Sequence, residues 1–311
     1  MRAVMPDSRS EPAVILRTVV GWLLAGLGAI VLVQVLVALA PGDAIDTLPD
    51  PALRGQLARE WRLDDPTYLR VVLGTLHALS GAWGSSWTVR PGAPVWALVM
   101  GAMGSSMVVL LPAWFVAVGV GLLGRGRAAV ALVSALPVVI LSLGTIESVN
   151  ALVWVGITSG WWSRPSFFAL PAEGGLVRDL LMIGVLGIGS AAAGEVAARL
   201  GETDAALDQA GFVLATRARG GSVRGLLWRH RAVPLLEAAQ AVFAPLTGGL
   251  VIVERLWGRP GVGDLLWRAV EARDVPVATG VIVVLASMTV LVGVTLDLCR
   301  RAWDPRLRIL V

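Results

Sequence analysis

Apolar positions along this chain gather in six long stretches, and polar segments that carry several arginines separate them. A helix needs about 20 mostly apolar residues to cross a bilayer. The stretches cover residues 13–40, 95–123, 128–160, 176–200, 232–253 and 277–299. The pattern therefore predicts an all-α membrane protein with six transmembrane helices in a single domain over residues 1–311.

Two of the stretches have unusual lengths. The first ends in Ala38-Leu39-Ala40, which resembles a signal-peptide cleavage site, but the apolar core of a signal peptide has only about 7–15 residues. We therefore interpret residues 13–40 as a retained membrane anchor. The stretch over 128–160 is too long for one straight crossing, so we expect Pro137 to kink it or to divide it into a surface helix and a span.

Arginine placement orients the predicted spans, because cytoplasmic loops of membrane proteins are enriched in basic residues. One set of loops, together with both termini, holds most of the arginines outside the long segment 41–94. Both termini should therefore be cytoplasmic. On this orientation residues 41–94 form an external insertion with a helix over Asp50–Leu63, and residues 201–231 form a large cytoplasmic loop.

Composition supports the membrane assignment and excludes several classes of enzyme. The 311 residues are 56% hydrophobic and 15% charged, against about 45–50% and about 25% in soluble domains. All 26 basic residues are arginines, so the chain has no lysine for an ATP-binding P-loop or for a Schiff base. If the protein uses ATP, another chain must bind it.

Cysteine and histidine are equally scarce. The single cysteine, Cys299, excludes an intrachain disulfide or a Cys-rich metal site. His77 and His230 fall in separate segments, so neither a metal-binding His-Glu-x-x-His motif nor a clustered nucleophile and base is present. We expect no metal and no catalytic residues on this chain.

The cytoplasmic loop has the pattern of two short helices joined by a sharp turn. A first helix over residues 205–219 places acids in its first turn and arginines in its last turn, as the helix dipole favours. Gly220 or Gly221 can take the left-handed C-cap, and Ser222 can N-cap a second helix over 223–231. The apolar or small residues near one face of the first helix are Leu207, Phe212, Ala215 and Ala218, and the acids are Asp204 and Asp208. Two interpretations of the loop are possible. It is either a solvated linker or a knob that inserts into a groove on a partner protein.

This loop resembles the ATPase-docking loop of permeases from the ATP-binding-cassette (ABC) importers of dipeptides, oligopeptides and nickel. The resemblance rests on Thr216–His230, and it extends in order along most of the chain. The other matching motifs are Pro41-Gly42-Asp43, Leu63-Asp64-Asp65-Pro66, Gly84-Ser85-Ser86 with Pro94-Val95, Val253-Glu254, Pro260-Gly261-Val262-Gly263, Ala272-Arg273-Asp274 with Pro276-Val277, and Asp304-Pro305-Arg306-Leu307-Arg308. Residues 134–197 match poorly, which leaves the choice of substrate open.

The resemblance implies a type I ABC importer permease fold in the inner membrane, with an extracytoplasmic helical insertion after the first helix. It implies a second permease subunit, a different chain in this family, two ATPase subunits that hold ATP and Mg²⁺, and an external substrate-binding protein. The cargo would be peptides, nickel or related small solutes, and this chain would be a transport subunit without enzymatic activity or a cofactor of its own. The residues implied in ATPase coupling are Thr216, Arg217, Ala218, Arg219, Gly220, Gly221, Ser222, Arg229 and His230.

Ionisable residues inside the predicted spans are further candidates, because a carboxylate in the hydrocarbon region is expensive. Glu147 shares a helix face with Asn150, and the pair faces either the translocation pathway or the subunit interface. Glu195 and Arg199 are spaced for a salt bridge, and Glu237 and Asp297 read as interfacial ion-pair partners, Asp297 lying close to Arg300 and Arg301.

The segment Pro260-Gly261-Val262-Gly263 predicts a bent external turn near the mouth of the pathway, where proline fixes φ and Gly261 and Gly263 supply positive φ. The main alternative to an ABC permease is a secondary transporter driven by an ion gradient. Such a protein would show inverted repeats and midplane charges. We find no convincing repeat between the halves of the chain, and most carboxylates fall near the ends of the spans.

Overall fold

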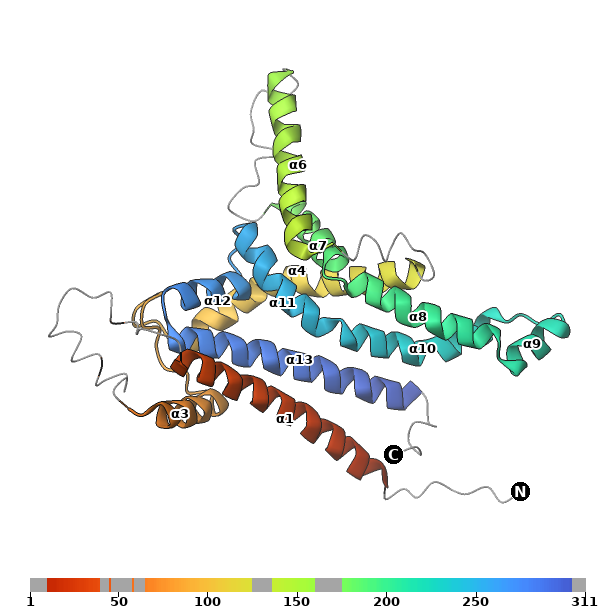
Figure 1. The fold of residues 1–311 in the computed structure, drawn as a ribbon, viewed down its shortest axis with the longest axis horizontal. Coiled ribbons are helices and arrows are strands. Elements are labelled where there is room, and N and C mark those ends of the chain that lie inside the picture. Colours follow the sequence, from red (N-terminus) through yellow and green to blue (C-terminus); the bar gives the residue numbers. More distant parts are fainter. Residues whose placement is uncertain are drawn as a thin grey trace. The chain divides into compact units, whose positions relative to one another are not determined.

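The computed structural model describes residues 10–39, 65–124, 136–159 and 175–303, with single residues at 45 and 58. Within these residues the regular structure is helical (Figure 1), apart from one isolated antiparallel bridge between Ser85 and Pro94. The helix predicted over Asp50–Leu63 falls almost wholly outside the described residues, as do the motifs at 41–43 and 304–308.

Three helices are long and apolar enough to cross a membrane: Val95–Gly124, His230–Leu256 and Val275–Trp303. A bent pair, Leu176–Gly189 with Ala192–Asp208, makes a fourth if the pair forms one span. The remaining two predicted stretches contain shorter apolar helical segments, Val19–Leu32 and Val138–Leu152. The described residues therefore support a multi-pass membrane protein, and the count of six spans stays a prediction.

The chain divides into two compact units, which are described separately. One unit comprises residues 18–106 and 260–291, and the other comprises residues 1–17, 107–259 and 292–311. We call them the 18–106/260–291 unit and the 107–259 unit. Three helices pass from one unit to the other: α1 (Ser10–Leu39), α4 (Val95–Gly124) and α13 (Val275–Trp303).

The core of the 18–106/260–291 unit lies where the first turns of α4 and α13 meet α12 (Val262–Glu271). Val262, Leu265 and Ala269 recur at spacings of three and four residues, so they share one buried face of α12. That face packs against Val95 and Val277, among others. A further helix, α3 (Thr67–Ser80), packs in the same unit and was not predicted.

Asp274 joins two segments of this unit that are far apart in the sequence. Its Oδ2 atom accepts hydrogen bonds from Ser86 Oγ (2.5 Å) and from the backbone N–H groups of Trp87, Thr88 and Val89 (3.0 Å each). Its Oδ1 atom accepts the N–H of Val277 at 3.3 Å, in the first turn of α13. The buried carboxylate therefore satisfies backbone donors that would otherwise lack partners.

Among the described residues, the 107–259 unit contains the rest of α4 and six further helices, together with the last part of α13. The further helices are α6 (Val138–Thr158), α7 (Leu176–Gly189), α8 (Ala192–Asp208), α9 (Gly211–Ala218), α10 (Arg224–Ala241) and α11 (Phe243–Leu256). Glycines let α4 approach α7 and α8 closely: a Cβ on Gly121 would lie 2.5 Å from Val196 Cβ, and one on Gly187 would lie 2.8 Å from the carbonyl oxygen of Ala113. Trp114 also donates its Nε1–H to the carbonyl of Ala239 on α10, at 2.8 Å.

Two predicted spans differ from straight helices. The stretch 176–200 was expected to be one span, but α7 and α8 meet at a 45° bend. Ala191 takes φ +61° at this bend, a left-handed conformation that non-glycine residues seldom adopt. In the third stretch, α6 begins directly after Pro137, which agrees with a division at that proline.

Candidate functional site: the α8–α10 elbow and the α6 carboxylate

The cytoplasmic loop of the prediction is an elbow formed by the end of α8, the short helix α9 and the start of α10. The expected continuous helix over 205–219 is wrong, because α8 ends at Asp208 and the extended backbone of Ala210 (φ −69°, ψ 129°) separates it from α9. Asp204 and Asp208 consequently lie in the last turns of α8 and not in the first turn of the next helix. Neither acid can therefore act on the α9 dipole in the predicted way.

The two acids instead form ion pairs that close the elbow. Arg231 of α10 donates Nε–H to Asp204 Oδ1 at 2.5 Å, and both side chains are mostly buried. Arg217 of α9 donates to Asp208 Oδ1 at 2.6 Å, in a pair that is about half exposed. The first pair fixes α10 against α8, and the second holds α9 near the end of α8.

The turn after α9 has the predicted left-handed C-cap, and Gly220 is the residue that provides it, with φ +69°. The N–H of Gly220 bonds to the carbonyl of Arg217 at 3.0 Å, and the N–H of Gly221 bonds to that of Thr216 at 3.0 Å. These two bonds form a Schellman motif. The predicted N-cap at Ser222 is wrong: Val223 is the N-cap of α10, and no side chain caps that end.

The elbow presents most of its predicted coupling residues to the surroundings. Thr216 is half-buried and His230 is exposed, Arg229 lies in α10, and the exposed tip consists of Arg217, Ala218, Arg219, Gly220, Gly221 and Ser222. The sequence did not single out Val213, which is fully buried and anchors α9. It also did not foresee that the rings of Phe212 and His230 would lie 5.0 Å apart.

Large apolar side chains accompany the arginines on this elbow. Phe212, Leu214 and Trp228 are each exposed by more than two fifths, at 43%, 52% and 48%. An exposed apolar surface bordered by basic groups is typical of a protein–protein contact. We refer to the tip and these three residues together as the elbow surface.

The second candidate site lies on α6. Glu147 and Asn150 are both exposed, and α6 contacts α7 and α11 mainly through residues near its start, such as Val138 and Leu141 against Gly189. Within the described part of the chain, neither Glu147 nor Asn150 forms an ion pair or a hydrogen bond. The sequence prediction that the two residues share a face agrees with their positions in α6.

The predicted external turn is formed differently from expectation. Gly261 is extended (φ −147°) and is the N-cap of α12, and Gly263 lies within that helix. The residue with positive φ is Gly258, at +61°, so the expected role of Gly261 and Gly263 in supplying positive φ is wrong. Ser106 of α4 accepts the N–H of Val262 at 2.7 Å and so satisfies a free donor at the start of α12.

The predicted ion pairs near the span ends are confirmed. Arg199 donates Nε–H to Glu195 at 2.6 Å, and Arg300 contacts both Glu237 (3.2 Å) and Asp297.

Sequence reasoning missed a buried charged cluster that joins α7 to the end of α11. It comprises Arg178, Asp179 and Arg259, and Arg259 Nη1 bonds to Asp179 Oδ1. No sequence signal marked this cluster, because its members come from separate motifs.

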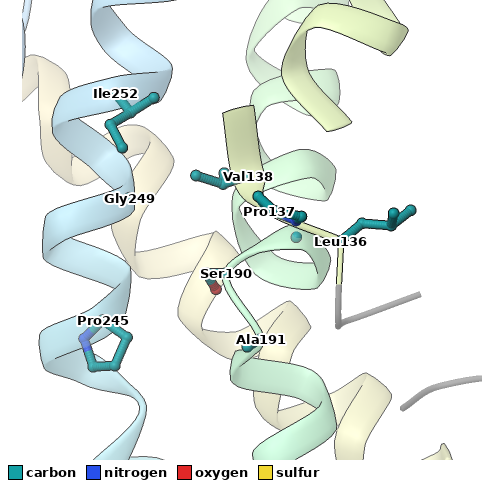
Figure 2. Close-up of a pocket in the computed structure, with 9 residues that line it drawn as sticks. Leu136, Pro137, Val138, Ser190, Ala191, Pro245, Gly249 and Ile252 are labelled. Carbon is teal, nitrogen blue, oxygen red and sulfur yellow. The ribbon is translucent and has the colours of Figure 1, made fainter. Parts of the chain in front are cut away.

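A pocket of about 270 Å³ lies at the bend between α7 and α8. Figure 2 shows Ser190 and Ala191 between α11 and the start of α6. The other lining residues are mostly apolar or small, and they are Leu136, Pro137, Val138, Gly189, Pro245, Gly249 and Ile252. No group of three or more metal-ligating side chains occurs among the described residues.

Comparison with known proteins shows what this chain is similar to. A family model for the inner-membrane component of binding-protein-dependent transport systems matches residues 205–309, which include the whole of α9 and α10. The oligopeptide transport system permease protein AppB of Bacillus subtilis is 23% identical over 90% of this chain and 94% of its own length. Over these residues the chain is similar to this family.

Further peptide permeases show a comparable similarity to this chain. A Brucella suis biovar 1 protein whose name describes a peptide permease is 27% identical over 92% of this chain and 97% of its own length. A Brucella abortus protein named for a peptide transport system permease is 27% identical over 172 residues, 52% of either chain. The chain thus spans about half the length of the first curated relatives it matches.

Proposed function

We propose that this chain is the membrane-spanning permease subunit of an ATP-driven ABC importer. It forms half of the translocation pathway, and a second permease subunit, encoded as a different chain, forms the other half. Two ATPase subunits bind beneath it and hold ATP and Mg²⁺, and an external binding protein delivers the solute. The match of residues 205–309 to the family model and the peptide-permease names of its relatives support this proposal.

The observation that carries the proposal is the elbow surface. The short helix α9 ends in a Schellman cap and is held by the Arg217–Asp208 ion pair, and the Arg231–Asp204 pair holds α10 against α8. The apolar and basic tip of this elbow is nevertheless exposed. A solvated linker has no need of such a rigid tip. The arrangement suits a lever, because a rigid segment transmits a push from a partner to the helices α8 and α10 without bending.

The elbow surface also indicates the chemistry of the ATPase groove. An apolar floor in the groove would fit the exposed side chains of Phe212, Leu214 and Trp228. An acidic rim around the groove would complement the charges of Arg217 and Arg219. When ATP closes the two ATPase subunits, the grooves approach each other and carry the elbows with them. The pathway then opens outward to accept solute, and ATP hydrolysis resets it inward.

Glu147 and Asn150 line the pathway in this proposal. Both are exposed, polar and without a partner among the described residues, in a helix that is otherwise strongly apolar. An acidic lining attracts the amino group of a peptide or a cationic solute, so peptides are the preferred cargo class, with nickel and other small solutes as further members. The turn at Pro260, Gly261 and Gly263 lies at the external end of the pathway and acts there as a gate.

The test is a charge reversal at the elbow tip. We expect Arg219→Glu to reduce co-purification of the ATPase subunits of the importer, because it places a carboxylate against an acidic rim. Arg90→Glu is the matched control, since Arg90 is also exposed but lies in the loop between α3 and α4. ATP-driven peptide uptake by vesicles that contain the full complex should fall in parallel. Equal co-purification by Arg219→Glu and the unaltered chain would contradict docking through the elbow, and uptake by the chain alone along an ion gradient would indicate a secondary transporter.

A further inference from the structure

The unpredicted helix α3 has two faces of different character. Small residues, Gly74 and Ala78, form the face that packs inside the 18–106/260–291 unit. The opposite face exposes four large side chains: Tyr68 (72%), Val72 (52%), Leu76 (56%) and Leu79 (57%). Their spacing of three or four residues aligns them along one side of the helix. We call these four residues the α3 stripe.

The packed face of α3 fixes its position along the axes of α1 and α13. We call a set of residues at the same height along these axes a level. Gln34 of α1 donates its Nε2–H to Thr279 Oγ1 of α13 at 3.0 Å, and a Cβ on Gly74 would lie 2.5 Å from Gln34 Oε1. Gly74, Gln34 and Thr279 therefore lie at one level. Figure 1 shows α3 beside the end of α1.

A second level lies one turn further along each helix. Ala78 of α3 is 2% exposed and shares a buried cluster with Ile30 of α1 and Val283 of α13. From the first level to the second, the residue number rises by four in α3 and in α13, whereas it falls by four in α1. Hence α3 runs alongside both helices, parallel to α13 and antiparallel to α1.

The second level lies at a depth where the bilayer is hydrocarbon. Val283 comes eight residues after Val275, the first residue of α13, which is about 12 Å at 1.5 Å per residue. With 29 residues, α13 is about 43 Å long and exceeds a hydrocarbon thickness of about 30 Å by about 13 Å. If half of the excess projects at each end, Ala78 lies about 5 Å inside the hydrocarbon. It lies deeper if more of the excess projects at the end that carries Arg300 and Arg301.

We propose that α3 is a half-span helix in the leaflet that holds the first turns of α13, and that the α3 stripe contacts the acyl chains of that leaflet. Leu76 and Leu79 lie on either side of the deeper level and reach the hydrocarbon. Tyr68 comes six residues before Gly74, about 9 Å further out, among the headgroups, where tyrosine is enriched. The inference rests on the membrane location of α13 and not on the proposed transport function.

The chemistry of the two faces favours lipid over a protein partner. Helices that pack inside membranes place small residues at their contacts, as Gly74 of α3 is placed against Gln34 of α1. The larger aliphatic residues then face the lipid. Between its two α3 contacts, Ile30 and Gln34, α1 exposes another leucine, Leu32. A second permease subunit is the rival occupant of the stripe, and the experiment separates the two.

The test places single cysteines on the stripe of the full chain, in a Cys299→Ser background and in its complex. Leu76→Cys and Leu79→Cys, each carrying an environment-sensitive fluorophore, are compared in vesicles of brominated phosphatidylcholine, with Arg90→Cys as an exposed loop control. We expect brominated lipid to remove most of the fluorescence at both stripe positions and aqueous iodide to leave it intact. The control should show the reverse.

Two outcomes would overturn the proposal. Quenching by iodide at Leu76→Cys and Leu79→Cys would place the stripe in water. Protection from both quenchers would place it against protein, as a second permease subunit on the stripe would do. Because the two positions are tested separately, failure of one variant to fold leaves the other to decide. Neither outcome touches the ATPase-docking role of the elbow, which the Arg219→Glu test addresses.

Discussion

At the scale of single residues, Asp274 shows how much one buried carboxylate can organise. Four donors converge on Oδ2, and three of them are backbone N–H groups of the loop that precedes α4. We expect Asp274→Asn to destabilise the protein by about 1–3 kcal/mol, because the amide offers one acceptor oxygen where the carboxylate offered two. The measurement is the thermal unfolding midpoint of the purified chain in detergent.

Glu195→Gln is the matched control for Asp274→Asn. Its partner is Arg199 at 2.6 Å, but both side chains are about half exposed, so the loss should not exceed about 1 kcal/mol. Equal unfolding midpoints for the two variants would show that the loop over 86–89 does not depend on the Asp274 carboxylate.

At the scale of elements, glycines decide how closely α4 approaches α7 and α8. We predict that Gly121→Ala and Gly187→Ala each lower the unfolding midpoint, at an overpacking cost of about 1–3 kcal/mol, because the new Cβ would meet Val196 or the carbonyl of Ala113 at 2.5 and 2.8 Å. Gly119→Ala and Gly184→Ala lie in the same two helices, with nothing within 4 Å of the added Cβ. These control variants should be neutral or slightly stabilising, since alanine favours helix. A uniform response of all four variants would contradict close packing at Gly121 and Gly187.

The same scale shows which elements the sequence could predict. Prolines before Val95 and Val138 mark the starts of α4 and α6, and the glycine pair after Arg219 marks the end of α9, because these residues act locally on the backbone. The bend at Ala191 could not be predicted, since an alanine at positive φ is held by its surroundings and carries no sequence signal.

The sequence could likewise predict only part of the candidate site. The exposed elbow tip followed from local turn chemistry at Gly220. The pairing of Asp208 with Arg217 and of Asp204 with Arg231 did not, because Gln209-Ala210 gives no sign that the helix stops there and ion pairing depends on how the helices pack. The helix α3 was missed for a related reason: its apolar residues divide between a protein face and an exposed face, so it does not read as a span.

At the scale of the whole molecule, α6 carries an exposed carboxylate, Glu147, in a strongly apolar helix. A carboxylate in a lipid-facing position is costly, and Glu147 has no partner among the described residues. In the proposed importer it would face water in the pathway or a polar group on the second permease subunit. The two cases differ in what the loss of charge does, because a pathway carboxylate acts on the solute, whereas an interface carboxylate holds two subunits together.

We predict the first case for Glu147→Gln: ATP-driven uptake of a cationic peptide falls well below that of the unaltered complex, while the two permease subunits still co-purify. Ser148→Ala is the control, because Ser148 is also exposed but its hydroxyl already bonds to the carbonyl of Gly144 within α6, at 2.7 Å. Uptake of a neutral peptide should fall less than that of the cationic one, since only the cation loses an attractive charge. Unchanged uptake would remove Glu147 from the pathway, and loss of co-purification would assign it to the contact between the permease subunits.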